Sequence, residues 1–116
     1  MAVKRIVSAI QTDNPAAATE FYGTILDMEL VMDQGWIQTY ASDTQSSAQI
    51  NVASEGGSGT AVPALSIEVD NFDEVFKAMK DAGYAIEYGP VDEPWGVRRF
   101  YVRDPFERLI NILTHI

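Results

Sequence analysis

The alternation of apolar and polar residues predicts two strands that each lead into a helix. The first strand covers residues 6–11, and the helix after it covers residues 15–26, with Pro15 at its first position, where a missing N–H costs nothing. The second strand covers residues 65–69, and its helix covers residues 72–82 after an Asx residue at capping position. The chain therefore presents the same strand-to-helix unit twice.

Short apolar segments separated by turn residues complete each half. They predict strands over 29–33, 36–41 and 48–53 in the first half, and over 84–88, 97–103 and 108–114 in the second. An Ile-Asn pair followed by a branched residue occurs late in each half, at Asn51 and at Asn111. Two landmarks that recur at nearly the same spacing indicate a duplication. We therefore predict an α+β fold with the order βαβββ twice.

The glycine-rich segment around residues 54–60 lies between these repeats and is typical of a flexible linker. It does not predict a phosphate-binding loop, because Pro63 and a strand follow it instead of a helix. We expect one domain over 1–116, with repeat one at 1–54, the linker at 55–62 and repeat two at 63–116.

Composition restricts the classes of function. The 116 residues contain no cysteine and only one histidine, which excludes disulfides, thiolate metal sites and two-histidine sites. No stretch approaches about 20 apolar residues, and no signal peptide is evident, so we expect a cytoplasmic protein without a membrane span. A net charge of −9 repels nucleic acid. The acidity either attracts a cationic ligand or serves only solubility.

A family resemblance rests on two segments. They are Phe21-Tyr22 with Leu26-Asp27-Met28 after the first helix, and Trp95-Gly96-Val97-Arg98-Arg99-Phe100-Tyr101-Val102-Arg103-Asp104-Pro105-Phe106 before Asn111. With the βαβββ order, they resemble the vicinal-oxygen-chelate superfamily, which includes glyoxalase I, extradiol dioxygenases, fosfomycin-modifying transferases and bleomycin-binding resistance proteins. The resemblance implies mixed sheets curled around a cavity, with the helices outside and the ligand inside. It also implies a homodimer.

In metal-dependent members of that family, the ligands come from four strand positions. The resemblance places these positions at Val7, Asn51, Ala64 and Asn111. Valine and alanine carry no donor atom, and asparagine offers only a neutral amide, whereas Zn, Ni and Fe(II) require imidazole or carboxylate donors. We therefore expect no metal and no other cofactor, which disfavours glyoxalase I and extradiol dioxygenase activity. His115 is expected to lie at a strand end.

Polar and aromatic residues are candidates to line the cavity. Alternation directs Phe100 and Val102 to the core and Arg99 and Tyr101 to the cavity, unless both face solvent on an edge strand. Trp36 is equally suited to core packing. The candidate ligand-binding residues are Gln11, Trp36, Gln49, Asn51, Glu68, Trp95, Arg99, Tyr101 and Asn111. Alternatively, Asn51 and Asn111 form a hydrogen bond with each other. We expect that alanine can replace Arg99 or Tyr101 without unfolding the protein.

These patterns favour a metal-free protein that binds a small organic molecule, sequestering an aromatic or cationic antibiotic or metabolite. The alternative is a metal-independent isomerase or lyase in which Glu68, if buried, acts as the general base. An ion pair between Glu68 and Arg99 competes with that role. A third alternative is a structural or regulatory protein with an empty cavity. Expected partners are a small-molecule ligand and a second copy of the chain, without nucleic acid or membrane.

Overall fold

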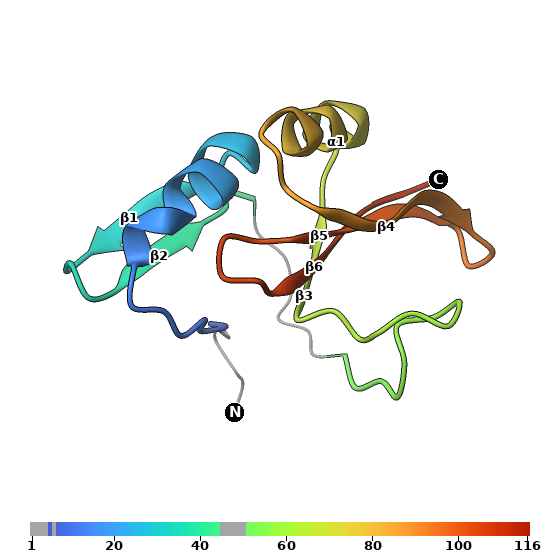
Figure 1. Ribbon diagram of the computed structural model, residues 1–116, viewed down its shortest axis with the longest axis horizontal. Coiled ribbons are helices and arrows are strands. Elements are labelled where there is room, and N and C mark those ends of the chain that lie inside the picture. The colour runs from blue at the N-terminus through green and yellow to red at the C-terminus, as the bar shows by residue number, and fades with distance from the viewer. Residues whose placement is uncertain (1–4, 6, 45–50) are drawn as a thin grey trace. The chain divides into compact units, whose positions relative to one another are not determined.

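The computed structural model describes residue 5, residues 7–44 and residues 51–116 (Figure 1). The chain divides into two compact units, Met1–Ser54 and Glu55–Ile116, and each is described by itself. Within the described ranges, no helix combines the length and apolarity that a membrane crossing requires.

The second unit has the predicted order of one strand, one helix and three strands. The elements are β3 Leu65–Glu68, α1 Phe72–Asp81, β4 Ile86–Glu93, β5 Val97–Arg103 and β6 Leu109–His115. They form one four-stranded sheet in the order β3-β6-β5-β4, in which β3 runs parallel to β6 and the other neighbours are antiparallel. The predicted βαβββ order and mixed sheet are confirmed for this half.

Strand β5 lies inside the sheet and is covered on both sides. Phe100 is fully buried toward α1, and its ring centre lies 5.4 Å from that of Phe72 and 5.1 Å from that of Phe76. Arg99 and Tyr101 point to the opposite side, called the polar face here, and are only 4% and 2% exposed. The predicted division of these residues between two faces is confirmed, and the alternative that Arg99 and Tyr101 face solvent on an edge strand is wrong, whereas the cavity on their side stays a prediction.

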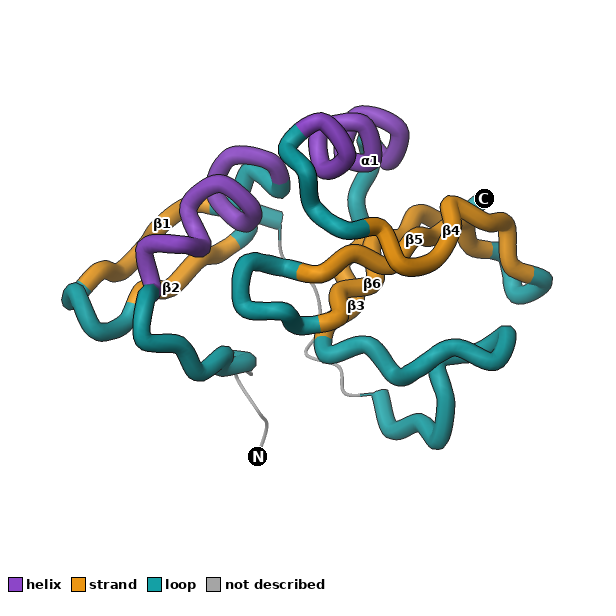
Figure 2. The backbone as a smooth tube through the Cα atoms, in the orientation of Figure 1, coloured by secondary structure: helices purple, strands orange, loops and turns teal. Residues whose placement is uncertain are grey.

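The segment that covers the polar face is the glycine-rich stretch 55–60, called the cover loop. Figure 2 shows this part of the chain as a loop on the side of the sheet opposite α1. Backbone hydrogen bonds from Gly56 N to Thr60 O, 2.8 Å, and from Thr60 N to Gly57 O, 3.0 Å, close it into a turn. The predicted linker is thus attached to the second unit by the contacts described below.

The described residues of the first unit contain two strands and a wide helix. The strands are β1 Glu29–Asp33 and β2 Gln38–Ala41, which pair antiparallel. The α-helix predicted over 15–26 is instead a 3-10 turn, Pro15–Ala17, followed by a π-helix, Thr19–Ile25. Gly23 interrupts this segment, and glycine is a poor α-helix former. Phe21 and Tyr22 of the π-helix are buried.

The outer strands predicted for the first repeat are not found in its described residues. Residues 7–11 and 51–53 have no strand conformation, whereas residues 6 and 48–50 lie outside the described part of the chain. Alternation marks which side chains share a face, but a strand also needs a neighbouring backbone to bond with. Among the described residues, the β1–β2 pair is the part of the predicted sheet of the first repeat that is found. The cavity between curled sheets stays a prediction.

Candidate functional site

Arg99 is the centre of the best-defined polar cluster in the second unit. Its Nη2 atom donates to Glu93 Oε2 at 2.8 Å and to Gly57 O at 3.3 Å. Its Nη1 atom donates to Gly56 O at 2.8 Å and to the Tyr101 hydroxyl at 2.9 Å. One guanidinium therefore joins β4, β5 and the cover loop.

Glu93 balances the charge of Arg99 inside the protein. Its side chain is buried, and it also accepts hydrogen bonds from Ser58 Oγ at 2.9 Å and from the Tyr88 hydroxyl at 3.0 Å. Burial raises the pKa of Glu93, but the hydrogen bonds from Ser58 and Tyr88 and the charge of Arg99 together outweigh burial, so its pKa lies below the ordinary value. The carboxylate is therefore ionised at neutral pH and pairs with Arg99.

Three aromatic rings surround the Arg99 guanidinium. Its carbon atom lies 4.9 Å from the ring centre of Tyr101, 5.0 Å from that of Trp95 and 5.4 Å from that of Tyr88. These distances are within the range of cation–π attraction. Trp95 is the outermost of the three, because it is 50% exposed. Its indole is available to a flat molecule from solvent.

Two glycines allow the cover loop to approach this cluster. A methyl group at Gly56 would overlap the carbonyl oxygen of Ala61 and lie 2.5 Å from the Tyr101 hydroxyl. A methyl group at Gly57, whose φ is +86°, would lie 2.7 Å from the Trp95 ring. Only glycine fits at both positions without a shift of the loop or of its neighbours.

Two buried polar atoms of the polar face have no hydrogen-bond partner among the described residues. They are Arg99 Nε, a donor, and Asn111 Oδ1, an acceptor. The Asn111 amide nitrogen donates to Ser66 Oγ at 3.1 Å, and Asn111 is paired with Tyr101 in the register of β5 and β6. Buried polar groups are normally satisfied. The polar face therefore has one donor and one acceptor whose hydrogen-bonding capacity is unused.

The Glu93 carboxylate predicts how stability depends on pH. Because its pKa is lower in the folded than in the unfolded chain, its contribution is present above the ordinary value of 4.5 and is lost as the pH falls below it. We expect the melting temperature to fall in acid, and the fall to be smaller in Glu93→Gln. Thermal unfolding followed by circular dichroism from neutral to acidic pH measures this. An equally steep acid dependence in Glu93→Gln would contradict the assignment.

Four of the predicted ligand residues belong to this part of the second unit. Trp95, Arg99 and Tyr101 come together directly, and Asn111 lies beside Tyr101. Glu68 is 59% exposed at its side chain, and its carboxylate lies 2.8 Å from His115 Nδ1. The predicted ion pair between Glu68 and Arg99 is therefore wrong, because Arg99 pairs with Glu93. His115 lies at the end of β6, as predicted.

The other predicted ligand residues belong to the first unit. Gln11, Trp36 and Asn51 are exposed there, and Gln49 lies outside the described residues. Trp36 is 78% exposed, so its alternative assignment to a core is wrong. The structure describes each unit by itself, so a joint site with the second unit stays a prediction.

Sequence reasoning missed Glu93, Tyr88 and the cover loop as parts of the cluster. A signal for Glu93 was present, because Pro94-Trp95-Gly96 is a hairpin turn that places Glu93 opposite Val97. Positions 97 and 99 share a face, so Glu93 and Arg99 are diagonal neighbours. No comparable signal reveals the backbone carbonyls of Gly56 and Gly57.

The four positions that hold metal in some family members do not fit a metal ion. Val7 and Ala64 lack a donor atom, and the side chains of Asn51 and Asn111 are neutral amides. In the part of the chain that the structure describes, no three His, Asp or Glu side chains are grouped as a metal site requires. No step of a mechanism is therefore assigned to a metal.

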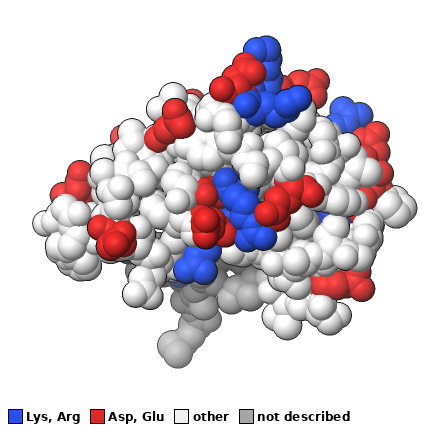
Figure 3. All heavy atoms as spheres, viewed as in Figure 1, with Lys and Arg blue, Asp and Glu red and all other residues white. Residues whose placement is uncertain are grey.

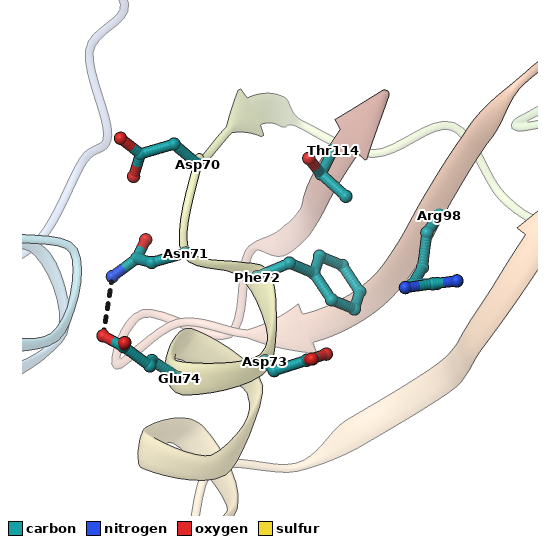
Figure 4. Close-up of a pocket in the computed structure, with 7 residues that line it drawn as sticks. All are labelled: Asp70, Asn71, Phe72, Asp73, Glu74, Arg98 and Thr114. Atoms are coloured by element: carbon teal, nitrogen blue, oxygen red, sulfur yellow. Dashed lines mark hydrogen bonds between the residues drawn. The ribbon is translucent and has the colours of Figure 1, made fainter. Parts of the chain in front are cut away.

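A separate hollow lies at the start of α1. It has a volume of about 310 Å³ and is lined by Asp70, Asn71, Phe72, Asp73, Glu74, Arg98 and Thr114 (Figure 4). Its carboxylates lie at the positive end of the helix dipole, which favours negative charge there and explains why acidic residues gather at this place. Arg98 is bound to Asp92 at 2.7 Å. The hollow contains none of the predicted ligand residues, and we assign it no function.

Some exposed charges of the second unit form local ion pairs. Arg103 bonds to Glu87 at 2.7 Å, and Lys77 bonds to Asp81 at 2.6 Å. In the view of Figure 3, basic side chains likewise lie next to acidic ones. These exposed pairs contribute little to stability.

Comparison with known proteins identifies the family. The chain is similar in fold to TnmS3, an antibiotic-binding protein from Streptomyces sp. CB03234, with 18% identity over 100% of this chain and 97% of that chain and a TM-score of 0.68. It is also similar to a protein from Sphaerobacter thermophilus DSM 20745, with 19% identity over 99% of this chain and 98% of that chain and a TM-score of 0.67. TioX from Micromonospora sp. ML1 is similar as well, with 19% identity over 100% of this chain and 96% of that chain and a TM-score of 0.59. No curated protein matches in sequence. A family model matches residues 3–112, and the chain belongs to the Glyoxalase/Bleomycin resistance protein/Dioxygenase superfamily.

Proposed function

We propose that this protein binds a small organic molecule without a metal and thereby sequesters an antibiotic or metabolite. The observation that carries the proposal is the Arg99 cluster, in which a buried guanidinium lies among Tyr88, Trp95 and Tyr101 on the polar face of the sheet. Ligand sites typically combine aromatic walls with a few fixed polar groups. Sequestration needs affinity only, and this cluster offers recognition groups.

The chemistry of the cluster supports binding more than catalysis. Arg99 and Glu93 neutralise each other at 2.8 Å, which leaves neither as a free acid or base. Glu68, the general base of the alternative isomerase or lyase, lies exposed against His115 instead of in an apolar pocket. No observation in the described residues favours that alternative.

The expected ligand is flat and is not an anion. The half-exposed Trp95 indole suits an aromatic ring, and the net charge of −9 attracts cations and repels anions. The antibiotic-binding neighbour TnmS3 shares the fold at low sequence identity. Its description as an antibiotic-binding protein is consistent with an antibiotic as the ligand, and it does not bear on the shape or charge of that ligand.

A fluorescence titration tests the proposal. We expect metal-free bleomycin or doxorubicin, an aromatic cation, to quench Trp95 saturably in a Trp36→Phe variant, where Trp95 is the only tryptophan. Native mass spectrometry should find the compound bound without stoichiometric transition metal. The companion variant Trp95→Phe assigns the signal, because quenching confined to Trp36 would place the site in the first unit. One tightly bound Zn, Ni or Fe per chain, or no saturable binding of any aromatic or cationic compound tested, would overturn the proposal.

A further inference from the structure

The cover loop occupies the recognition groups of the candidate site. Gly56 O and Gly57 O accept the hydrogen bonds of Arg99, Ser58 donates to Glu93, and Thr60 Oγ1 lies 2.9 Å from the Tyr101 hydroxyl. A short piece of the chain therefore makes the contacts that a bound molecule would make. The cover loop therefore fills the place on the polar face that a ligand would take.

Little other than these polar contacts holds the loop. Residues 55–60 are Glu-Gly-Gly-Ser-Gly-Thr, without a large apolar side chain, so the loop buries little apolar surface. It adds no strand to the sheet, and the hydrogen bonds within it are the turn between Gly56 and Thr60 and two local bonds, from Gly59 N to Glu55 and from Thr60 Oγ1 to Gly57 O. Because it has no place in the strand ladder and no apolar anchor, the segment opens at a lower cost in free energy than the strands do. A molecule with the same polar groups can replace it.

The loop does not satisfy every buried polar atom of the polar face. Arg99 Nε and Asn111 Oδ1 stay unpartnered among the described residues, although both side chains are more than nine-tenths buried. A buried donor or acceptor without a partner is unfavourable. A ligand that supplies one further acceptor and one further donor would satisfy what the loop leaves open.

The geometry indicates the chemistry of the replacement. The atoms that the cover loop places on Arg99 are two neighbouring peptide carbonyls, which are neutral acceptors. The positive charge of Arg99 is already balanced by Glu93 at 2.8 Å. A carboxylate or phosphate at the same place would add a second negative charge beside Glu93, and like charges at short range repel. The site therefore favours neutral carbonyl oxygens over anions.

Resting on the proposed function, we propose that the ligand displaces the cover loop and is an uncharged or cationic peptide-like compound. Two neighbouring amide carbonyls of this compound replace Gly56 O and Gly57 O on Arg99, and a flat ring lies against Trp95. The site is thus specific for amide-rich, aromatic molecules. Its affinity is lowered by the fraction of time for which the loop is closed.

The test uses a defined probe, the blocked peptide N-acetyl-Phe-Gly-Gly-amide, and its counterpart with a free C-terminal carboxylate. In Gly56→Ala, the new methyl group cannot fit against Ala61 O and Tyr101, so the loop shifts away from the sheet. We expect Gly56→Ala to bind the amide probe at least about tenfold more tightly than the wild type by calorimetry. The free acid should bind more weakly than the amide to every variant.

Two further variants keep the result interpretable. Gly59→Ala adds the same methyl group to the same loop, but into open space, so it should bind within a few-fold of the wild type although its φ of +75° strains alanine. Thr60→Val removes the hydroxyl beside Tyr101 without a change in size, and it should also bind more tightly. Hydrogen exchange at β5 confirms that each variant is folded.

Hydrogen exchange of the loop separates this inference from the proposed function. Displacement predicts that the amide protons of Gly56 and Thr60, bonded within the turn, exchange faster when the probe or a drug is bound. Slower exchange would mean that the loop closes over the ligand, which overturns displacement but leaves binding intact. Equal affinity of the amide and the free acid would overturn the ligand class. Absence of binding in the wild type and in all variants would overturn both proposals.

Discussion

Replacing Arg99 with methionine is expected to lower the free energy of unfolding by about 3–5 kcal/mol, because the change removes one partner of a buried ion pair. Glu93 would keep its charge and lose a hydrogen bond of 2.8 Å, in a side chain that is only 3% exposed. The carbonyls of Gly56 and Gly57 would lose their donor as well. Urea unfolding followed by circular dichroism measures the change.

A second pair in the same sheet provides the control. Arg103 and Glu87 also bond at 2.7 Å, but their side chains are 39% and 41% exposed. Arg103→Met should therefore cost no more than about 1 kcal/mol. The double variant Arg99→Met/Glu93→Gln should regain part of the stability lost in Arg99→Met, since no unpaired charge is left. Equal losses in Arg99→Met and Arg103→Met would show that the Arg99 pair is not buried in solution.

The removal of the Trp95 side chain is expected to reduce ligand affinity by about 30-fold, which corresponds to about 2 kcal/mol for a tryptophan hot spot. Trp95 is half exposed, so its loss should change stability far less than the loss of Arg99. Titration of Trp95→Ala with the compound that binds the wild type, by calorimetry, separates affinity from folding.

The matched control for this variant is Ile116→Ala. Ile116 is an exposed apolar residue of the same unit that does not belong to the Arg99 cluster. Its replacement should leave affinity unchanged. If Trp95→Ala bound as tightly as the wild type, the ligand would lie elsewhere, and the Arg99 cluster would be a structural feature of the sheet.

The second half of the fold could be predicted because each of its elements carries a local signal. The alternation of apolar Phe100 with polar Arg99 indicated which side chains lie on each face of β5. Asn71 indicated where α1 begins. In the first half, the local sequence signals and the observed elements agree less well. Gly23 widens its helix, and alternation at residues 7–11 predicts a strand that needs a partner backbone which local patterns do not specify.

The candidate site was predictable for side chains on regular strands and for Trp95 in the hairpin turn between β4 and β5. Arg99, Tyr101 and Asn111 follow from the alternation of β5 and β6. Their partners do not, because Gly56 and Gly57 bind through backbone carbonyls that every residue type has. The sequence suggested that Arg99 could be replaced without unfolding, and its burial against Glu93 reverses this expectation.

The use of backbone carbonyls by the cover loop has a consequence for how such proteins diverge. Peptide oxygens are inherited whatever the side chain, so most substitutions in the loop leave the Arg99 contact intact. The close approaches at Gly56 and Gly57 oppose change most directly, and the positive φ of Gly59 also favours glycine. Loops that join compact units tolerate insertions and deletions more readily than strands do. A single insertion in the cover loop would therefore change the groups that lie against Arg99, and with them the expected ligand preference. The sheet that carries Arg99 would be left unaltered.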